Sequence, residues 1–425
     1  YKTSTVRGCW AQFFLHWLRE GYISMATSTD YRYYTDSKGH WWSGDEWKQF
    51  TDTGDRSGEK LPEGWPKKLE GPLVWSGPEL KKQPERYLHT FTEQELKELD
   101  NAVKSFEASG LDLPEITRET FPLPRLGPVL DSYAEDLYKG IGVRLLRGID
   151  VDRYSKRERI VIYLGVSSYI GDLRDAQGVN RALIRIKSIL HIPKDERAPI
   201  AVSQQTTDAQ MFHNDIGLDI VSLFVLDTPK EGGDSLITSS YTIYNELAQT
   251  RPDLLRLLAD PDEFDWRGKP KEGGLIHYLN EKFIAAFSTR VFIGFGDIPR
   301  DEAYPALNDK QKDAFGAFHW IGYKNSLILP IQKGDIEYVN NLYLQHSRHG
   351  YIEDDNHRRH IARLWLRNTK YNKDVKYPPS LQQKIDEGFF PEKYKQEIPL
   401  DEFDEEDIKK RYGANTLLSL YAKPV

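Results

Sequence analysis

The chain has 425 residues, of which 39% are hydrophobic and 29% are charged, and its formal net charge at pH 7 is −7. This composition supplies enough apolar side chains for a substantial core and is too polar for an integral membrane protein. The acidic balance, with no long basic stretch, argues against a nucleic-acid partner. We therefore expect a soluble, cytoplasmic protein with one catalytic core and additional segments at its ends.

A single cysteine, Cys9, restricts the chemistry of the chain. An internal disulfide or a thiolate metal cluster needs at least two sulfurs, so any metal ion would be held by His, Asp or Glu. The apolar run at 10–18 is interrupted by Gln12 and His16, and it is far shorter than the ~20 apolar residues of a membrane helix. It favours neither a signal peptide nor a membrane anchor.

The pattern along the chain predicts three regions. Residues 1–85 read as an irregular, aromatic-rich N-terminal extension, and an initiator-like context at Met25 leaves open whether residues 1–24 are native. Residues 86–372 carry the regular patterns of a catalytic domain. Residues 373–425 are expected to form a charged tail that packs on this domain.

Three helices are predicted in the first half of the domain. Thr92 and Glu95 match a capping box, and apolar residues follow at spacings of three and four, as one buried helix face requires. Further helices are expected near 127–139, before a β-like run at 141–146, and near 155–164.

From residue 182 onward the pattern changes to short strands separated by turns. These strands are predicted at 182–189, 218–226, 282–287, 326–331, 335–339 and 361–366, with helical segments at 241–258 and 308–319. The pattern indicates a mostly β protein with helices (α+β) and a β-sandwich or barrel core.

Three residues are candidate metal ligands. His213 and Asp215 are two positions apart, so in an extended chain both side chains point to the same side. A facial triad of two histidines and one carboxylate needs a distant second histidine and leaves coordination positions open. His346 is the candidate, and His349 is the alternative ligand if the register is shifted. Each histidine of this segment could also be an ordinary polar residue of a loop or edge strand.

Two arginines follow in the last predicted strand. Arg359 and Arg363 are four residues apart and therefore share a face, about 13 Å from each other at roughly 3.3 Å per residue. Arginines on an inward face need anions. A pair of ordinary salt bridges to Asp or Glu is the alternative explanation, and it is as good an explanation for Arg363 as a ligand is.

Taken in order, these motifs resemble the taurine dioxygenase/TfdA family of the clavaminate synthase-like oxygenases. The resemblance covers roughly residues 86–370. It rests on the motifs His213-Asn214-Asp215, Gly232-Gly233-Asp234-Ser235-Leu236, Tyr244-Asn245-Glu246-Leu247, Asn341 through Gln345-His346, and Arg359. Ser235 stands where the family usually has threonine, and the hydroxyl is retained.

The resemblance implies a double-stranded β-helix (jelly-roll, cupin-like) core with N-terminal helices and a helical insertion. It also implies that His213, Asp215 and His346 bind Fe(II), and that Ser235 and Arg359 bind the co-substrate 2-oxoglutarate. The reaction would use O2 and release succinate and CO2. Arg363 matches a second arginine that contacts an acidic substrate in some members, which suggests a small carboxylate or sulfonate substrate. Related halogenases lack the metal-binding Asp, so halogenation is disfavoured.

Two other functions are compatible with parts of the pattern. A zinc-type metallohydrolase could use the same ligands, although it leaves Ser235 and Arg359 without a role. A catalytically inactive β-barrel could bind a small acid or a protein partner through the aromatic N-terminal extension. The sequence leaves open a homo-oligomer.

Overall fold

Two β-sheets that face each other form the centre of the protein. They are seen in a computed structural model that describes residues 60–177, 181–191, 193, 203–264, 274–294, 305–378, 381–382, 385–386, 389 and 396–400. The predictions for residues 1–59 and 401–425 lie outside the described residues.

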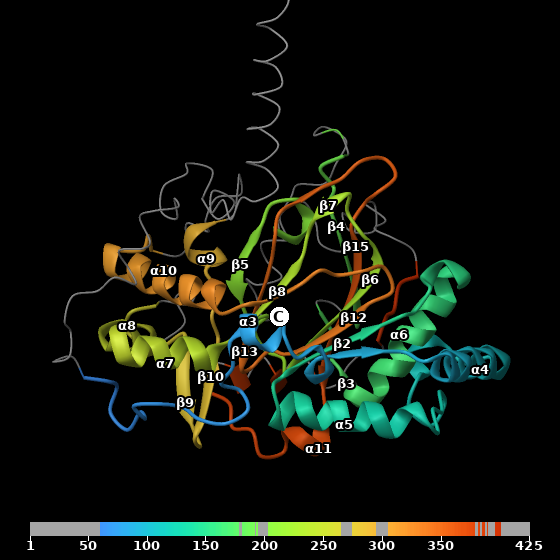
Figure 1. The fold of residues 1–425 in the computed structure, drawn as a ribbon, viewed down its shortest axis with the longest axis horizontal. Helices are drawn as coiled ribbons and strands as arrows, with labels where there is room; N and C mark the ends of the chain where they lie inside the picture. The colour runs from blue at the N-terminus through green and yellow to red at the C-terminus, as the bar shows by residue number, and fades with distance from the viewer. Residues whose placement is uncertain are drawn as a thin grey trace, which may run out of the picture.

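The larger sheet runs through the middle of the molecule in Figure 1. Its strands are paired antiparallel, apart from the parallel pair at the edge formed by β1 and β2. Their order is β1 (Leu88–Thr90), β2 (Val143–Arg147), β12 (Ile336–Asn340), β6 (Ile220–Asp227), β15 (His360–Arg367) and β3 (Leu173–Arg174), and β4 (Leu183–Lys187) also pairs with β15.

The smaller sheet faces the larger one and is antiparallel throughout. Its strand order is β11 (Leu327–Leu329), β8 (Ser235–Ser239), β13 (Leu344–Arg348) and β5 (Gln210–His213). Polar residues of this sheet, which include His213 and His346, come close to polar residues of the larger sheet. The space between the sheets is therefore where a polar site can form.

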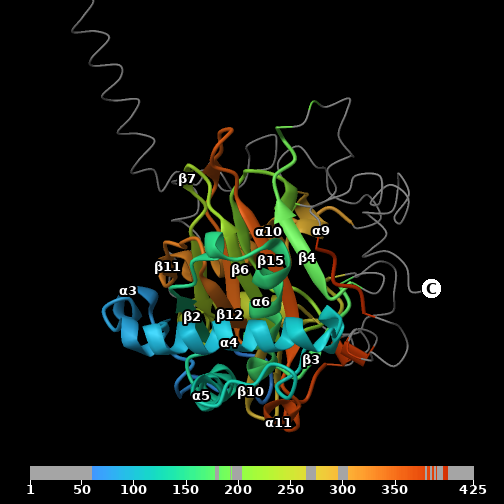
Figure 2. The same cartoon turned by 90° about the vertical axis from the view of Figure 1, so that its right-hand side faces the viewer.

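Three helices cover the outer face of the larger sheet: α4 (Glu93–Ser109), α5 (Leu126–Lys139) and α6 (Lys156–Ile170). Figure 2 shows α4 lying across this face with α5 and α6 beside it. The predicted capping box is present, since Thr92 and Glu95 accept each other's backbone N–H groups. Alternate sheet residues such as Ile336, Phe224 and Leu364 join the hydrophobic core under the helices.

A mostly helical insertion connects β8 to β11 and lies on the other side of the molecule (Figure 1). It comprises α7 (Ser240–Thr250), α8 (Pro252–Ala259), the hairpin of β9 (Ile276–Leu279) and β10 (Lys282–Ala285), α9 (Arg290–Ile293) and α10 (Asp309–Lys324). The described part of the N-terminal extension packs here. The side chain of Asn245 on α7 exchanges hydrogen bonds with the backbone N–H and C=O of Leu69.

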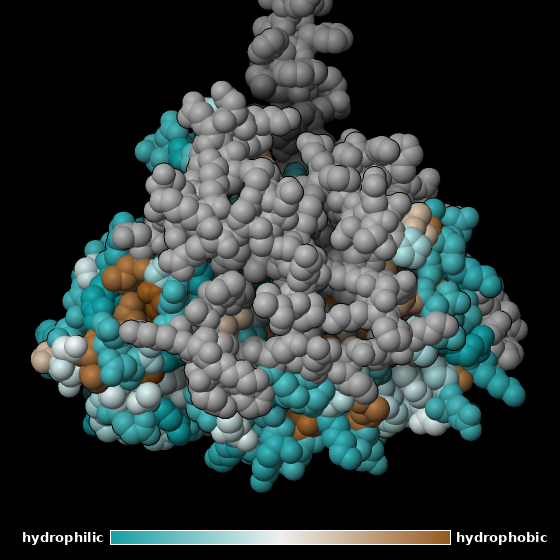
Figure 3. Space-filling view, turned by 180° about the vertical axis from the view of Figure 1, so that it is seen from behind, coloured by the Kyte–Doolittle hydropathy of each residue, from teal (hydrophilic) through white to brown (hydrophobic). Residues whose placement is uncertain are grey.

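Short elements complete the fold. They are α3 (Gly77–Leu80), the ribbon of β7 (Glu231–Gly232) and β14 (Tyr351–Ile352), α11 (Thr369–Asn372), and 3-10 turns at Pro84–Arg86, Leu113–Glu115, Val151–Arg153 and Ser203–Gln205. On the face shown in Figure 3, the described surface is mostly hydrophilic, with hydrophobic residues in small groups. Among the described helices, none combines the length and the apolar character needed to cross a bilayer.

The structure confirms a mixed fold of helices and sheets, with helices at each of the predicted helical positions. The third helix is longer than predicted and extends to Ile170. The jelly-roll connection of the two sheets stays a prediction.

Candidate active site

The three predicted metal ligands meet between the two sheets. His213 on β5 and His346 on β13 lie directly opposite each other in the antiparallel ladder, and their ring centroids are 4.3 Å apart. Asp215 follows two residues after β5 ends. One nitrogen of each imidazole and one oxygen of Asp215 all lie within 4.8 Å of one another. Two imidazoles and one carboxylate form the donor set of a facial triad.

The protonation states of this cluster suit a metal ion. Burial lowers the pKa of His213, and burial together with the neighbouring His213 lowers the pKa of His346 to about 3, so both rings are neutral at pH 7. Burial alone would raise the pKa of Asp215, but the charge of Arg363 and the two histidines outweigh it and lower this pKa. Neutral imidazoles and an ionised carboxylate are the forms that bind metal ions.

Hydrogen bonds orient two of the ligands. His213 Nδ1 lies 2.8 Å from the carbonyl oxygen of Met211 and therefore carries the proton, which leaves Nε2 with a free lone pair. Asp215 Oδ2 accepts from Arg363 Nη1 at 2.9 Å and from Trp365 Nε1 at 3.0 Å. The other oxygen, Oδ1, is the one that lies 3.8 Å from His213 Nε2. This arrangement leaves Oδ1 to face a metal ion.

Buried amides hold the turn that carries Asp215. The side chain of Asn341 accepts from the backbone N–H of Asp215 at 2.9 Å and donates to its carbonyl oxygen. Asn214 donates to the carbonyl oxygens of Asn341 and Leu344 and accepts from Gln345 Nε2. These contacts connect the segment of His213 and Asp215 to β13, the strand that carries the third candidate ligand, His346.

The indole of Trp365 offers a direct test of this arrangement. We expect Trp365→Phe to weaken Fe(II) binding about 10-fold or more, because the variant lacks the N–H that holds Asp215 Oδ2, and outer-shell partners contribute about 10- to 100-fold to metal affinity. Anaerobic Fe(II) titration measures the effect. Trp75→Phe is the matched control, since Trp75 Nε1 donates at 3.0 Å to the carbonyl oxygen of Ile141, away from the cluster. Equal iron affinity in the two variants would contradict this role.

A glycine turn that leads into Ser235 lies against the side chain of Arg359. Gly232 and Gly233 have φ angles of 75° and 77°, in the left-handed region that favours glycine. A Cβ atom on Gly232 would lie 2.4 Å from the carbonyl oxygen of Gly350, and one on Gly233 would lie 3.6 Å from Arg359 Cδ. The turn therefore brings the start of β8 close to the side chain of Arg359.

The guanidinium group of Arg359 is buried, with 6% of the residue exposed. Its Nε and Nη1 atoms have no hydrogen-bond partner among the residues that the structure describes. Burial lowers the pKa of Arg359, and Tyr351 and Glu337 oppose this effect. A buried, charged donor without an acceptor is costly, so the geometry calls for an anionic ligand at this position.

Arg363 has a different environment. Besides the bond to Asp215, its Nε donates to Gln177 Oε1 at 2.8 Å, and its Cζ lies 4.9 Å from the ring centroid of Trp365. The ordinary salt bridge considered for Arg363 is thus present, and its carboxylate partner is a candidate metal ligand.

The sequence singled out six residues for the site, and the structure places them in two groups. His213, Asp215, His346 and Arg363 form one group, and Ser235 and Arg359 form the second. His349, the alternative ligand, lies elsewhere, since its Nδ1 is 3.2 Å from Asp234 Oδ2.

Sequence reasoning assigned no role to four residues that lie beside the candidate site residues: Gln177, Glu337, Arg348 and Trp365. The strand pattern places Trp365 on the same face as Arg363, but it does not predict the hydrogen bond from Trp365 to Asp215. For Glu337, which lies in a predicted strand, the sequence did not indicate an inward position, because glutamate is seldom buried.

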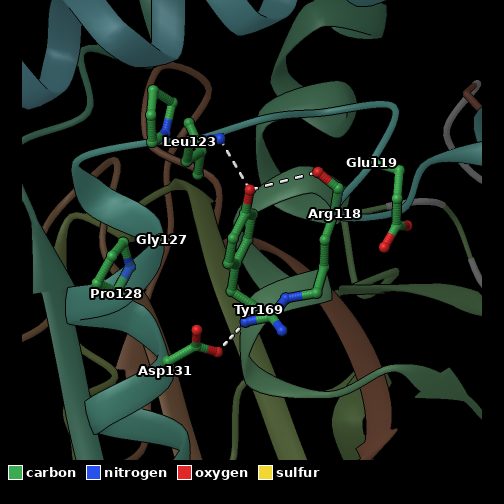
Figure 4. A pocket seen from close by; sticks show the side chains of 8 residues that line it. Arg118, Glu119, Leu123, Gly127, Pro128, Asp131 and Tyr169 are labelled. Atoms are coloured by element: carbon green, nitrogen blue, oxygen red, sulfur yellow. Dashed lines mark hydrogen bonds and ion pairs between the residues drawn. The ribbon is translucent and has the colours of Figure 1, made fainter.

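A separate depression lies on the helical side of the molecule (Figure 4). Tyr169, Leu123 and the ion pair of Arg118 with Asp131 form its walls. The Tyr169 hydroxyl accepts from the backbone N–H of Leu123, and the Arg118 guanidinium covers the Tyr169 ring at 4.6 Å. None of the candidate ligands lines this depression, so it is not the candidate active site.

The residues present fit an iron ion and 2-oxoglutarate. The donor set and its protonation states suit Fe(II), and the buried Arg359 offers unpaired N–H groups to a carboxylate.

Comparison with known proteins also points to an enzyme that uses iron and 2-oxoglutarate. The model of the "Taurine catabolism dioxygenase TauD, TfdA family" matches residues 108–365, more than half of the chain. The taurine hydroxylase-like protein SAT17 of Stachybotrys chartarum is 29% identical over 76% of this chain and 85% of its own length. FR-33289 synthase of Streptomyces rubellomurinus is 26% identical over 71% of this chain and 90% of its own length.

The fold also has a counterpart among solved structures. An asparagine oxygenase, solved in complex with Fe(II), 2S,3S-3-hydroxyasparagine and succinate, has a TM-score of 0.52 and 12% identity, covering 71% of this chain and 98% of its own. The family match is the stronger evidence, because it extends over the predicted motifs from His213 to Arg363. The chain therefore belongs to the TauD/TfdA dioxygenase family and is a non-haem iron, 2-oxoglutarate-dependent oxygenase.

Proposed function

We propose that this protein oxidises an unactivated C–H bond of a small, anionic organic substrate. The observation that carries the proposal is the meeting of His213, Asp215 and His346 within 4.8 Å, on the same side of the larger sheet as Arg359, whose Nε and Nη1 atoms have no partner among the described residues. When bound, iron and 2-oxoglutarate supply the oxidising power, with succinate and CO2 as the products of the co-substrate.

In this proposal, each side chain has one task. His213 Nε2, Asp215 Oδ1 and one nitrogen of His346 hold the iron. Arg359 binds the distal carboxylate of 2-oxoglutarate, and the Ser235 hydroxyl is a further donor. The two sheets hold the histidine rings in place and limit the access of water to them. The side chains of His213 and Asp215 are 24% and 10% exposed, so one side of the cluster is open to a substrate.

The anionic substrate is inferred from Arg363. Two of its nitrogens are occupied by Gln177 and Asp215, and Nη2 donates to none of the described residues. An N–H group next to the metal ligands is suited to a carboxylate or sulfonate and would orient the rest of the substrate toward the iron. The name of the relative SAT17 refers to taurine, a small sulfonate, and favours the same class.

The test combines a substrate screen with one variant. We expect succinate release to be stimulated by sulfonates, amino acids or aryloxy acids, and not by neutral analogues. Arg363→Gln retains a donor for Asp215 but removes the charge, so the KM for the substrate should rise about 10-fold or more while the KM for 2-oxoglutarate is unchanged. A rise only in the KM for 2-oxoglutarate would assign Arg363 to the co-substrate instead.

The two alternative functions lack support from the relatives. A metallohydrolase would be active with zinc in the absence of 2-oxoglutarate, and an inactive binding module would show no iron-dependent absorption band with 2-oxoglutarate. Both measurements use the same purified protein and decide between the three functions.

A further inference from the structure

Glu337 is a buried carboxylate between the two sheets that the proposed chemistry leaves without a role. It lies on β12 and is 1% exposed. Its neighbours in the strand, Ile336 and Tyr338, pack under the helices, so Glu337 points to the opposite side, toward the smaller sheet. There its Oε1 accepts from Ser235 Oγ at 3.0 Å. Its Oε2 is buried and unpartnered within the part of the chain that the structure describes.

The surroundings of Glu337 are unusual for a carboxylate. Its partners in the adjacent strands are Leu145 on β2 and Leu223 on β6, both apolar. Burial raises the pKa of Glu337 to about 7. The Ser235 bond and the charge of Arg359 oppose this rise, and the nearby Asp335 adds to it. No ion pair between Glu337 and Arg359 is found among the described residues, although both are buried and each influences the pKa of the other.

The charge of Glu337 decides where the Ser235 hydroxyl can donate. An ionised carboxylate only accepts, so the single hydroxyl hydrogen of Ser235 is then used on Glu337. A protonated Glu337 can itself donate to Ser235 Oγ, which frees the hydroxyl hydrogen for another acceptor. Only the second arrangement lets Ser235 donate to a carboxylate held by Arg359.

We propose that Glu337 is a positioning residue that takes up a proton when the co-substrate binds and thereby turns the Ser235 hydroxyl toward the distal carboxylate. This inference rests on the proposed roles of Ser235 and Arg359. A carboxylate placed next to Glu337 favours the neutral form of Glu337 further, because two like charges at a buried position repel each other. Binding of 2-oxoglutarate and protonation of Glu337 are therefore coupled.

The coupling predicts a pH dependence with a definite sign. Below a pH of about 7, Glu337 is already protonated in the free protein, and the affinity for 2-oxoglutarate is high and constant. As the pH rises above this value, binding requires proton uptake, and the Kd increases by up to about tenfold per pH unit. The groups Asp335, Arg359 and Glu353 share this environment, so the effect has to be assigned by substitution.

The experiment is anaerobic calorimetry of 2-oxoglutarate binding to the Fe(II)-loaded full chain, between about pH 6 and about pH 8.5, in buffers of different ionisation enthalpy. The expected result for the unaltered protein is an uptake approaching one proton per ligand above neutral pH. Glu337→Gln should abolish this uptake and make the Kd independent of pH, because the amide donates to Ser235 at every pH. Persistent uptake in Glu337→Gln would overturn the proposal.

Glu353→Gln is the matched control. Glu353 also has a raised pKa through burial, and its Oε1 accepts from the backbone N–H of Arg359 at 2.8 Å, but Ser235 bonds to Glu337 and not to it. The Glu353→Gln variant should keep the proton uptake, and loss of the uptake in this variant would also overturn the proposal.

Infrared difference spectra of the unaltered protein give a readout that needs no variant. Binding of 2-oxoglutarate should produce the C=O band of a neutral carboxylic acid. Binding without uptake refutes only the role of Glu337, whereas no binding at any pH refutes the proposed function.

Discussion

Replacing His346 by alanine should abolish iron binding and reduce succinate formation by about 1,000-fold or more. The variant removes one of three candidate ligands from the middle of β13, where the ring lies 4.3 Å from the ring of His213. Two remaining ligands cannot define the facial geometry that a triad provides. Iron content after anaerobic loading and the visible band formed with 2-oxoglutarate measure the first effect, and succinate release measures the second.

His349→Ala is the control for this prediction. His349 is only three residues further along the chain, but it pairs with Asp234 and lies outside the cluster. Its replacement should leave iron content and turnover close to those of the unaltered protein. The opposite result, with iron lost on replacement of His349 and retained on replacement of His346, would show that the ligand register is displaced.

Local sequence patterns were sufficient for the helices around the core. The capping box at Thr92 and the apolar spacing after it predict the start and the buried face of α4, because an N-cap and a buried stripe are both local properties. Most strands of the larger sheet were predicted for a similar reason. Their residues alternate between the helix-facing core and the interior, and β6 and β15 are long enough for this alternation to be visible.

Three strands of the smaller sheet were not predicted: β5, β8 and β13. They are short, and β13 consists of Leu344 followed by four polar residues, although four of its five residues are buried. Strands that carry a functional site lose the hydrophobic pattern by which strands are recognised. The candidate ligands on these strands were proposed instead from the His213/Asp215 spacing, from the donor set of a facial triad, and from the resemblance to a family.

The contacts that Glu337 and Trp365 make could not be derived from local patterns. Each depends on which residue of a neighbouring strand lies opposite, and this register is a property of the assembled sheets. Trp365 contacts Asp215 across 150 residues of sequence, and Glu337 contacts Ser235 across 102. Spacing along the chain carries no information on such pairs.

The second large effect is expected at Arg359. Arg359→Ala should raise the KM for 2-oxoglutarate about 100-fold, which corresponds to roughly 3 kcal/mol, because removing one partner of a buried charge pair costs about that much. Arg359→Lys keeps the charge but loses the planar fork, so a smaller increase of about 10-fold is expected. Initial rates of succinate release at varied 2-oxoglutarate concentrations measure both.

Arg358→Ala provides the comparison at the adjacent position. Arg358 lies at the surface, where its Nη2 is 3.2 Å from Asp355 Oδ1. Its replacement should leave the KM for 2-oxoglutarate unchanged. If Arg359→Ala left this KM unchanged while Arg363→Gln raised it, the co-substrate carboxylate would bind at Arg363. The Nε and Nη1 atoms of Arg359, which no described residue pairs with, argue against that exchange, since Arg363 already donates to Gln177 and Asp215. We therefore expect Arg359 to lie at the co-substrate end of the proposed site and Arg363 at its substrate end.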